Sequence, residues 1–184
     1  MGCNGGQVGS PWKWFENKGV VSGGDFGDGT KCFDYTMPQC AHHVESTTMQ
    51  SCDDIPQVAP QCKSTCQTNS SIDYAGDKNH ATSSYAVRGV DSIKTDIVTY
   101  GTVTAAFTVY EDFLTYKSGV YSHQTGSALG GHAIKLIGYG TEGGEDYWLA
   151  VNSWNNTWGD QGTFKILQGD CGINRQVHAG LAAV

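Results

Sequence analysis

From Tyr85 to the C-terminus, apolar residues recur at short intervals, and glycine-rich turns separate the runs. The first run predicts a helix that Asp91 and Ser92 cap and that ends at Gly101. The alternating runs after it predict short strands at 103–109, 119–121, 132–139, 147–153 and 163–167. Short strands joined by tight turns are typical of an antiparallel, β-barrel-like unit. We therefore expect the C-terminal part of the chain to form one such unit.

A second helix is predicted near the start of the chain, at 8–21. Ser10 is its expected cap, Pro11 lies in its first turn, and Gly19 ends it. Trp12 lies on its apolar side. A helix this short needs a surface to pack on, because its own hydrogen bonds do not stabilise it in water.

The region 23–80 has little periodic apolar pattern. It is rich in Gly, Ser, Thr, Asp and Pro, and it holds most of the 7 cysteines, crowded between Cys32 and Cys66. Cross-links must replace a core here, so we predict a disulfide-stapled loop from an oxidising compartment. The sequons at 69–71 and 155–157 are compatible with secretory passage. Because the cysteine count is odd, at least one cysteine is free or has its partner outside this sequence.

Composition and charge exclude several classes of function. The 184 residues are 39% hydrophobic and 16% charged, which is ordinary for one globular domain or two small ones and excludes disorder throughout. Lys and Arg number 11 against 18 Asp and Glu, a net charge of −7, and no basic cluster suits nucleic acid. No apolar run approaches the roughly 18 residues that cross a bilayer. The first residues lack the basic start and apolar core of a signal peptide.

Two segments, GGHAI and NSWNNTWG, carry a candidate acid–base pair, His132 and Asn152. Alone, His132 is better explained as a structural histidine, and Asn152 as part of a turn around a core tryptophan. Together they are more specific, because a proton-transferring histidine needs a partner that fixes its tautomer and ring plane. Trp154 and Trp158 can then shield the hydrogen bond from water.

The phrases GGHAIKLIGYG, YWLAVNSWNNTWGDQGTFKI and GDCGIN resemble the C-terminal half of papain-family cysteine peptidases, and GCNGG at 2–6 resembles the family's substrate-binding loop. The resemblance covers nearly the whole chain. It implies that His132 is the acid–base residue and that Asn152 orients it. It also implies that backbone groups of Gly5, Gly6 and Gly131 hold an extended peptide.

The fold implied by this resemblance is the α+β, papain-like, two-domain fold in incomplete form. Residues 1–30 are expected to be a remnant of the helical left domain with the glycine-rich substrate loop. Residues 31–82 are the expected disulfide-rich, occluding-loop region, and residues 83–184 are the expected β-barrel-like right domain with His132 and Asn152.

The run Cys40-Ala41-His42-His43 resembles the occluding loop of the cathepsin B-like subfamily. There, paired histidines receive the substrate's C-terminal carboxylate, as imidazolium donors can at acidic pH. Zinc binding is the structural alternative for a group of cysteines and histidines, but the spacings fit disulfides better, so no metal or cofactor is expected. The resemblance implies the bridges Cys32–Cys66 and Cys40–Cys52. It leaves Cys3, Cys62 and Cys171 without partners in this chain.

The nucleophile of the family lies in a Cys-Gly-Ser-Cys-Trp-like motif that this sequence lacks. Cys3 is an unsuitable substitute, because Gly2, Gly5 and Gly6 around it describe a loop rather than the helix N-terminus that stabilises a thiolate. We therefore expect the nucleophilic cysteine to precede residue 1, and the chain alone to be inactive. A glycine-rich start is also typical of an internal loop.

Two positions depart from the cathepsin B pattern. Gln176 stands where a glutamate floors the pocket for the second residue before the cleaved bond, and Ala106 and Ala133 form the walls implied for that pocket. We expect this pocket to favour apolar or aromatic residues over arginine. Thr157 stands where the acidic member of the loop-closing ion pair is expected, and 45–51 contains no arginine. A looser loop with more endopeptidase activity is the expected consequence.

The implied function is peptide-bond hydrolysis through an acyl-enzyme, with endopeptidase and dipeptide-removing activity. The implied partners are peptide or protein substrates, a propeptide and cystatin-like inhibitors, in a lysosomal, endosomal or secreted location. Trp154 is expected beside the bound substrate. The main alternative is a non-catalytic papain-fold protein, and a third is a secreted disulfide-rich interaction module. The residue at the upstream nucleophile position distinguishes the first two.

Overall fold

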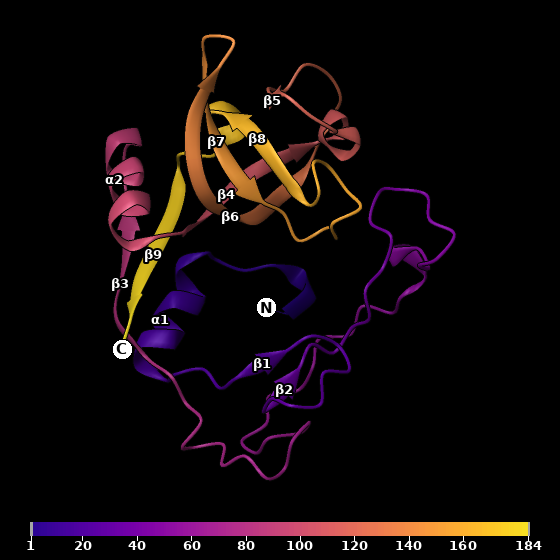
Figure 1. Ribbon diagram of the computed structural model, residues 1–184, viewed down its shortest axis with the longest axis vertical. Helices are drawn as coiled ribbons and strands as arrows, with labels where there is room; N and C mark the ends of the chain where they lie inside the picture. The colour runs from indigo at the N-terminus through magenta and orange to yellow at the C-terminus, as the bar shows by residue number, and fades with distance from the viewer. Residues whose placement is uncertain (1, 184) are drawn as a thin grey trace.

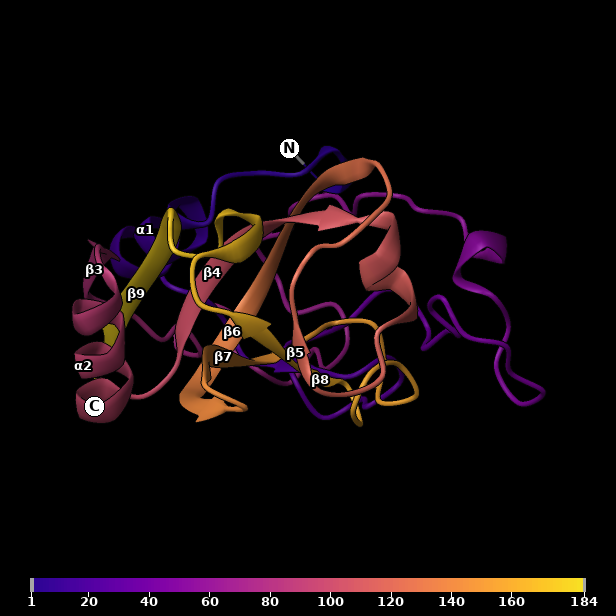
Figure 2. The ribbon, with the colours of Figure 1, turned by 90° about the horizontal axis from the view of Figure 1, so that it is seen from above.

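The computed structural model describes residues 2–183. A seven-stranded sheet forms its centre, in the order β3-β9-β4-β6-β7-β8-β5. Helix α2 contacts β3, β4 and β6, whereas α1 contacts β3 and β9. Figure 1 shows the disulfide-rich segment extending away from this sheet, and Figure 2 shows the same separation from above.

Neighbouring strands of the sheet are antiparallel except for β5 and β8, which are parallel. The strands are β3 Ala81–Val87, β4 Val103–Tyr110, β5 Val120–Tyr121, β6 Ala128–Glu142, β7 Glu145–Val151, β8 Thr163–Leu167 and β9 Gln176–Ala182. Within residues 2–183, β3 and β5 end the strand order and do not pair with each other, so the sheet is not closed into a barrel. The α+β class is confirmed, and the barrel-like description is corrected to an open sheet.

The predicted strand positions are confirmed, but two strands were missed, and β6 and β7 differ from their predicted bounds at both ends. β6 runs far beyond both ends of the predicted 132–139, because it pairs with β4 along one part and with β7 along another. β7 ends at Val151, which leaves Asn152 in the following loop. β3 and β9 were missed because their polar, glycine and alanine positions hide the alternation, although Val87, Val177 and Ala179 are buried.

Both helices exist, but their predicted caps are wrong. α1, Gly9–Asn17, begins before Ser10 because its first turn packs on β9, where a Cβ on Gly9 would lie 2.7 Å from the His178 ring. Its end is as predicted: the backbone N–H of Gly19 donates to Trp14 O, and Gly19 has a positive φ of 74°.

α2, Val90–Tyr100, has Gly89 at its cap position, and no side chain caps its N-terminus. The strand-to-helix connection needs φ = 86° at this residue, and glycine adopts that value without strain. Asp91 and Ser92 therefore lie inside the first turn. Gly101 ends the helix as predicted.

The core lies between the strands and the irregular segments that cover them. Aromatic side chains dominate it, and the fully buried ones are Phe113, Trp148, Trp158 and Phe164. The two indole N–H groups have acceptors, since Trp148 Nε1 donates to Asn174 Oδ1 at 2.7 Å and Trp158 Nε1 donates to Leu114 O at 2.9 Å. Burial of these polar groups therefore does not offset the gain from aromatic packing.

Disulfides stabilise the region between α1 and β3. Cys32 joins Cys66, and Cys40 joins Cys52, which are the pairs that the resemblance implies. Two short parallel strands, β1 Gly23–Gly24 and β2 Phe33–Asp34, are the regular sheet structure of this region. Residues 40–52 are called the disulfide loop below.

Within residues 2–183, no group of three or more His, Cys, Asp or Glu side chains is arranged to hold a metal ion. The same part of the chain contains no helix that is both long and apolar enough to cross a membrane.

Candidate active site

His132 and Asn152 meet across the β6–β7 pair. His132 lies on β6, and Asn152 directly follows β7, where Lys135 is opposite Val151 in the ladder. His132 Nε2 lies 2.8 Å from Asn152 Oδ1. Ser153 N also donates to this oxygen, at 2.8 Å, which identifies it as the amide oxygen. Because an amide oxygen only accepts, Nε2 carries the hydrogen, and Nδ1 is left free to accept a proton.

Aromatic rings surround this pair. The ring of Trp154 stacks on His132 with centroids 5.0 Å apart, and Phe107 meets the imidazole edge-on at 6.0 Å. Burial lowers the pKa of His132, and the hydrogen bond to Asn152 partly opposes this shift. Trp158 packs on Trp154 rather than on the imidazole. The predicted shield is thus a single indole supported by a second one.

The two histidines of the disulfide loop contact the same indole. His42 stacks on Trp154 with centroids 4.9 Å apart and planes 8° apart, and His43 meets Trp154 edge-on at 4.8 Å. The two imidazoles are themselves 4.3 Å apart. Trp154 therefore links the predicted carboxylate-binding pair to the His132–Asn152 pair.

Two cavities flank this cluster. One, of about 680 Å³, lies between the disulfide-rich segment and the loop after β7, and His42 and Trp154 are among its lining residues. The other, of about 720 Å³, is lined by Gly5, Gly6, α1 and Ala133. His132 lines neither of these two cavities, but Ala133 beside it lines one and Trp154 stacked on it lines the other.

Three of the residues predicted to form one pocket lie in a single row across the sheet. Ala106 on β4 is opposite Ala133 on β6 and opposite Gln176 on β9. Gly131, on β6 next to His132, is opposite Thr108. Residues far apart in sequence are thus brought to one side of the His132–Asn152 pair.

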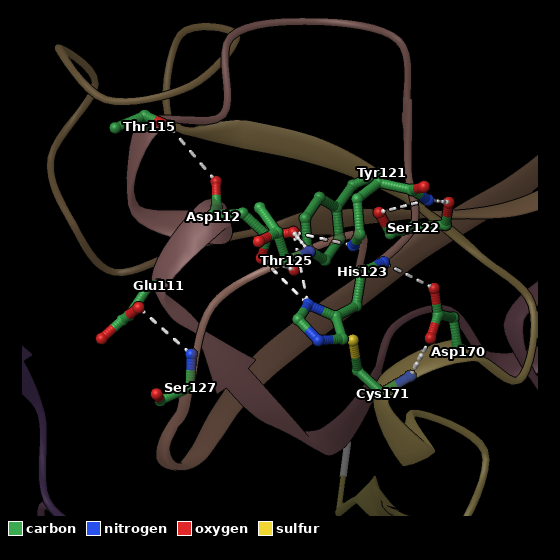
Figure 3. Close-up of polar contacts among 11 residues, drawn as sticks. Glu111, Asp112, Thr115, Tyr121, Ser122, His123, Thr125, Ser127, Asp170 and Cys171 are labelled. Atoms are coloured by element: carbon green, nitrogen blue, oxygen red, sulfur yellow. Dashed lines mark hydrogen bonds and ion pairs between the residues drawn. The ribbon is translucent and has the colours of Figure 1, made fainter.

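Sequence reasoning missed a polar network around Asp112, between β4 and β6. The Asp112 carboxylate accepts from Tyr121 OH at 2.7 Å, Gln124 N at 2.8 Å, Thr125 N at 3.1 Å and His123 Nδ1 at 3.2 Å. Figure 3 shows Tyr121, His123 and Thr125 around this carboxylate. Burial raises the pKa of Asp112, but the hydrogen bonds outweigh burial and hold it well below its usual range.

The Asp112 network fixes the segment that leads into β6. Glu111 Oε2 accepts from Ser127 N at 3.1 Å, and Ser127 directly precedes the first residue of the strand that carries His132. Asp170 ties the same segment to η4, Asp170–Gly172, by accepting from His123 N at 2.8 Å and from Cys171 N at 2.6 Å. An acidic residue in a short polar segment gives no sequence signal for such a role, because two of its four donors are backbone N–H groups.

The free cysteines differ in environment. Cys3 and Cys62 are exposed, whereas Cys171 is half-buried beside Asp170 and Tyr121. Burial, together with the neighbouring Asp170 carboxylate, raises the pKa of Cys171 to about 12. This thiol is therefore protonated and unreactive at neutral pH.

We expect acid to loosen the disulfide loop through His42. Burial against Trp154, reinforced by the nearby His43 and His132, lowers the pKa of His42 from 6.5 to about 4. When the loop is open, the His42 imidazole binds a proton below about pH 6.5. When the loop is closed, the same imidazole binds a proton only near pH 4. The closed loop should therefore lose stability as pH falls from about 6.5 to about 4, and the change should level off below that.

Hydrogen-exchange protection of amides in 41–51, corrected for intrinsic exchange, measures this effect. His42→Phe keeps a ring against Trp154 but cannot bind a proton, so its protection should vary much less with pH. Equal pH dependence in both proteins would contradict the assignment to His42.

Comparisons with known proteins agree with this geometry. Residues 1–181 match the family model of the papain family cysteine proteases. The chain is 45% identical to a cathepsin B-like cysteine proteinase of Schistosoma japonicum, covering 98% of this chain and 53% of that protein. It is 46% identical to cathepsin B of Dictyostelium discoideum, covering 98% of this chain and 54% of that protein.

A solved structure, procathepsin B S9 from Trypanosoma congolense, superposes with a TM-score of 0.78 at 30% identity, covering 98% of this chain and 55% of that chain. The chain thus spans about half the length of the curated relatives it matches. It belongs to the papain family of cysteine proteases and is similar to its cathepsin B-like members.

Proposed function

We propose that this chain is the His- and Asn-bearing part of a cathepsin B-type cysteine peptidase, whose nucleophilic cysteine lies outside the sequence given. The observation that carries the proposal is the 2.8 Å hydrogen bond between His132 Nε2 and Asn152 Oδ1. It leaves Nδ1 of a buried imidazole free to exchange a proton with a reacting group.

In the proposed reaction, the cysteine and His132 rest as a thiolate–imidazolium pair. The thiolate attacks the peptide carbonyl, and His132 gives its proton to the leaving amine. His132 then takes a proton from water, which hydrolyses the thioester. A neutral partner such as Asn152 suffices to orient the ring, because the thiolate already compensates the imidazolium charge.

The two cavities support a mode of substrate binding in which the peptide occupies both of them. Backbone groups of Gly5, Gly6 and Gly131 hold the peptide extended, by adding it as a strand. His42 and His43 bind the C-terminal carboxylate of a substrate that ends in the cavity under the disulfide loop. A bound carboxylate compensates the burial that lowers the pKa of His42, so the imidazole gains its proton as the substrate binds.

Each of the three regions supplies a part of this machinery. Residues 1–30 supply the glycine loop and α1, residues 31–82 supply the disulfide loop, and residues 83–184 supply the acid–base pair. α1 contacts β3 and β9 of the third region, so the first region is held against the sheet directly. Trp12 Nε1 donates to Thr104 Oγ1 at 3.1 Å across this contact.

The proposed enzyme also opens its cleft for internal cleavage. Among the described residues, the ion pairs are His123–Asp112 and Lys165–Glu142, and neither joins the disulfide loop to the sheet. Weak closure supports endopeptidase activity beside the removal of C-terminal dipeptides. The further partners are a propeptide and cystatin-like inhibitors, and the location is lysosomal, endosomal or secreted, as the disulfides favour.

The test is a peptidase assay on the protein encoded with its upstream segment. We expect hydrolysis of fluorogenic peptides that thiol alkylation abolishes, and no hydrolysis by residues 1–184 alone. Serine or glycine at the upstream nucleophile position, with no hydrolysis, would favour a non-catalytic papain-fold protein instead.

Gln176 is proposed to set the preference for the second residue before the cleaved bond. Because its amide is neutral, Phe-Arg reporter peptides should be cleaved at least about tenfold better than Arg-Arg peptides, a difference of about 1.4 kcal/mol. Gln176→Glu adds a carboxylate to the row that contains Ala106 and Ala133, so Arg-Arg cleavage should rise. Comparable cleavage of both peptides by the unmodified protein would contradict the assignment.

A further inference from the structure

The Asn155 side chain joins the disulfide loop to the loop that follows β7. Its Nδ2 donates to Cys40 O at 3.3 Å and contacts Met49 Sδ at 3.2 Å. Its Oδ1 accepts from Asn156 N at 2.6 Å, which fixes the amide orientation and directs Nδ2 to the loop. Both hydrogens of the amide nitrogen are thereby engaged by the disulfide loop.

These contacts hold the loop as one unit. Ala41 N donates to Gln50 O at 2.9 Å, Cys52 N donates to Ala41 O at 3.3 Å, and the disulfide joins Cys40 to Cys52. Because the two sides of the loop are tied together, a contact at Cys40 and Met49 fixes the position of both. Among the described residues, no ion pair joins the loop to the sheet. The uncharged Asn155 side chain holds the loop closed instead, and we call this contact the latch.

The same nitrogen is an acceptor for N-linked glycosylation. Asn155, Asn156 and Thr157 form a sequon. In that modification Nδ2 forms a bond to the anomeric carbon of an oligosaccharide carried on a lipid pyrophosphate. The nitrogen loses one proton, and the lipid pyrophosphate leaves. One of the two hydrogens that hold the disulfide loop is therefore replaced by a sugar.

We propose that glycosylation of Asn155 and closure of the disulfide loop exclude each other, so that glycan occupancy at this residue sets whether the cleft is covered. A sugar ring does not fit between Nδ2 and groups that lie 3.2 and 3.3 Å from it. A molecule glycosylated before folding is held open, and a molecule folded without the glycan closes. The inference rests on the proposed function only in that the loop covers a substrate cleft.

Glycosylation of the other sequon, at Asn69, is not coupled to closure of the disulfide loop. Asn69 Oδ1 accepts from Ser71 N at 3.1 Å and from Ser71 Oγ at 2.6 Å, and its Nδ2 makes no hydrogen bond within residues 2–183. A glycan on Asn69 leaves the disulfide loop unchanged. Asn69→Gln is therefore a matched control for the loss of one glycan.

The experiment uses the protein expressed from its whole gene in a eukaryotic secretory cell. Glycopeptide mass spectrometry gives the occupancy of Asn155, and lectin chromatography separates the glycosylated form. The rate of Met49 oxidation by dilute hydrogen peroxide, relative to Met37 in the same molecule, then reports whether the latch is closed. Glycan occupancy and Met49 oxidation do not depend on peptide hydrolysis. The result of this experiment is therefore independent of the test of the proposed function.

Thr157→Ala removes the sequon but keeps the Asn155 amide, so Met49 should be protected. Asn155→Asp removes the sequon and both donated hydrogens with little change of shape. Met49 should therefore oxidise at least about fivefold faster, the factor expected if only one of the two contacts contributes a full hydrogen bond. Met49 should oxidise in the glycosylated form at the rate seen in Asn155→Asp. In Asn69→Gln, Met49 should oxidise at the same rate as in the unmodified protein. Protected Met49 in molecules that carry the Asn155 glycan, or an unoccupied Asn155 in all secreted molecules, would overturn the proposal.

Discussion

Replacement of His132 by alanine, in the protein with its upstream segment, should lower kcat/KM for peptide substrates by about a thousandfold or more. In the proposed mechanism, the substitution removes the group that keeps the nucleophile ionised, protonates the leaving amine and activates water. Asn152→Ala should cause a smaller loss, because the ring remains but its orientation is no longer fixed by the 2.8 Å hydrogen bond. Initial rates with a fluorogenic peptide measure both effects.

His80→Ala is the matched control for the His132 substitution. The His80 side chain is exposed, and its Nδ1 lies 3.3 Å from Glu16 O, at the C-terminal part of α1 rather than at the site. Its activity should equal that of the unmodified protein. If His132→Ala kept most of the activity while remaining folded, His132 would be a structural residue and the proposed mechanism would be wrong.

Asp112→Ala should lower the free energy of unfolding by about 3 kcal/mol, because four donors lose a charged acceptor and the two backbone N–H groups cannot easily find another. Urea unfolding measures this change. Asp146→Ala is the control: Asp146 Oδ1 accepts from Thr141 Oγ1 at 2.6 Å on an exposed hairpin. That loss should stay within about 0.5 kcal/mol.

The contribution of Asp112 to the free energy of unfolding should also depend on pH, and it should decrease in acid. Its folded-state pKa is held well below the usual value of about 3.9. The stabilisation is therefore fully present above about pH 5, begins to fall near pH 4, and is lost as pH falls through the folded-state pKa. The difference in stability between the unmodified protein and Asp112→Asn should narrow over the same range. A constant difference down to pH 2 would show that the charge of Asp112 contributes little.

Local signals in the sequence predicted the elements more reliably than their ends. Gly19 and Gly101 end their helices as expected, because a positive φ suits glycine wherever a helix stops. The caps were predicted wrongly, since a side-chain cap contributes only about 1 kcal/mol and packing overrides it. Gly9, the first residue of α1, lies against the ring of His178, which is on a strand that the sequence pattern did not reveal.

Some features of the candidate site could likewise be predicted from the sequence, and others could not. His132 and Asn152 stand out because the segments around them are distinctive, and their partnership requires only that adjacent strands pair. The stack of His42 on Trp154, the Asn155 contacts and the Asp112 network have no comparable signal. The partners of His42 and Asn155 are distant along the chain, as in Asn155 with Met49, which is 106 positions earlier.

By itself, the sequence determined the α+β class, most strands, the pairing of His132 with Asn152 and the disulfide-rich character of 23–80, since each depends on residue type and short-range pattern. Only the tertiary structure decided that the sheet stays open, that one indole joins His132 to the two histidines of the disulfide loop, and that a sequon asparagine holds this loop. The physical reason is that such contacts are fixed by the packing of the whole molecule. No short stretch of residues carries the free energy that selects them.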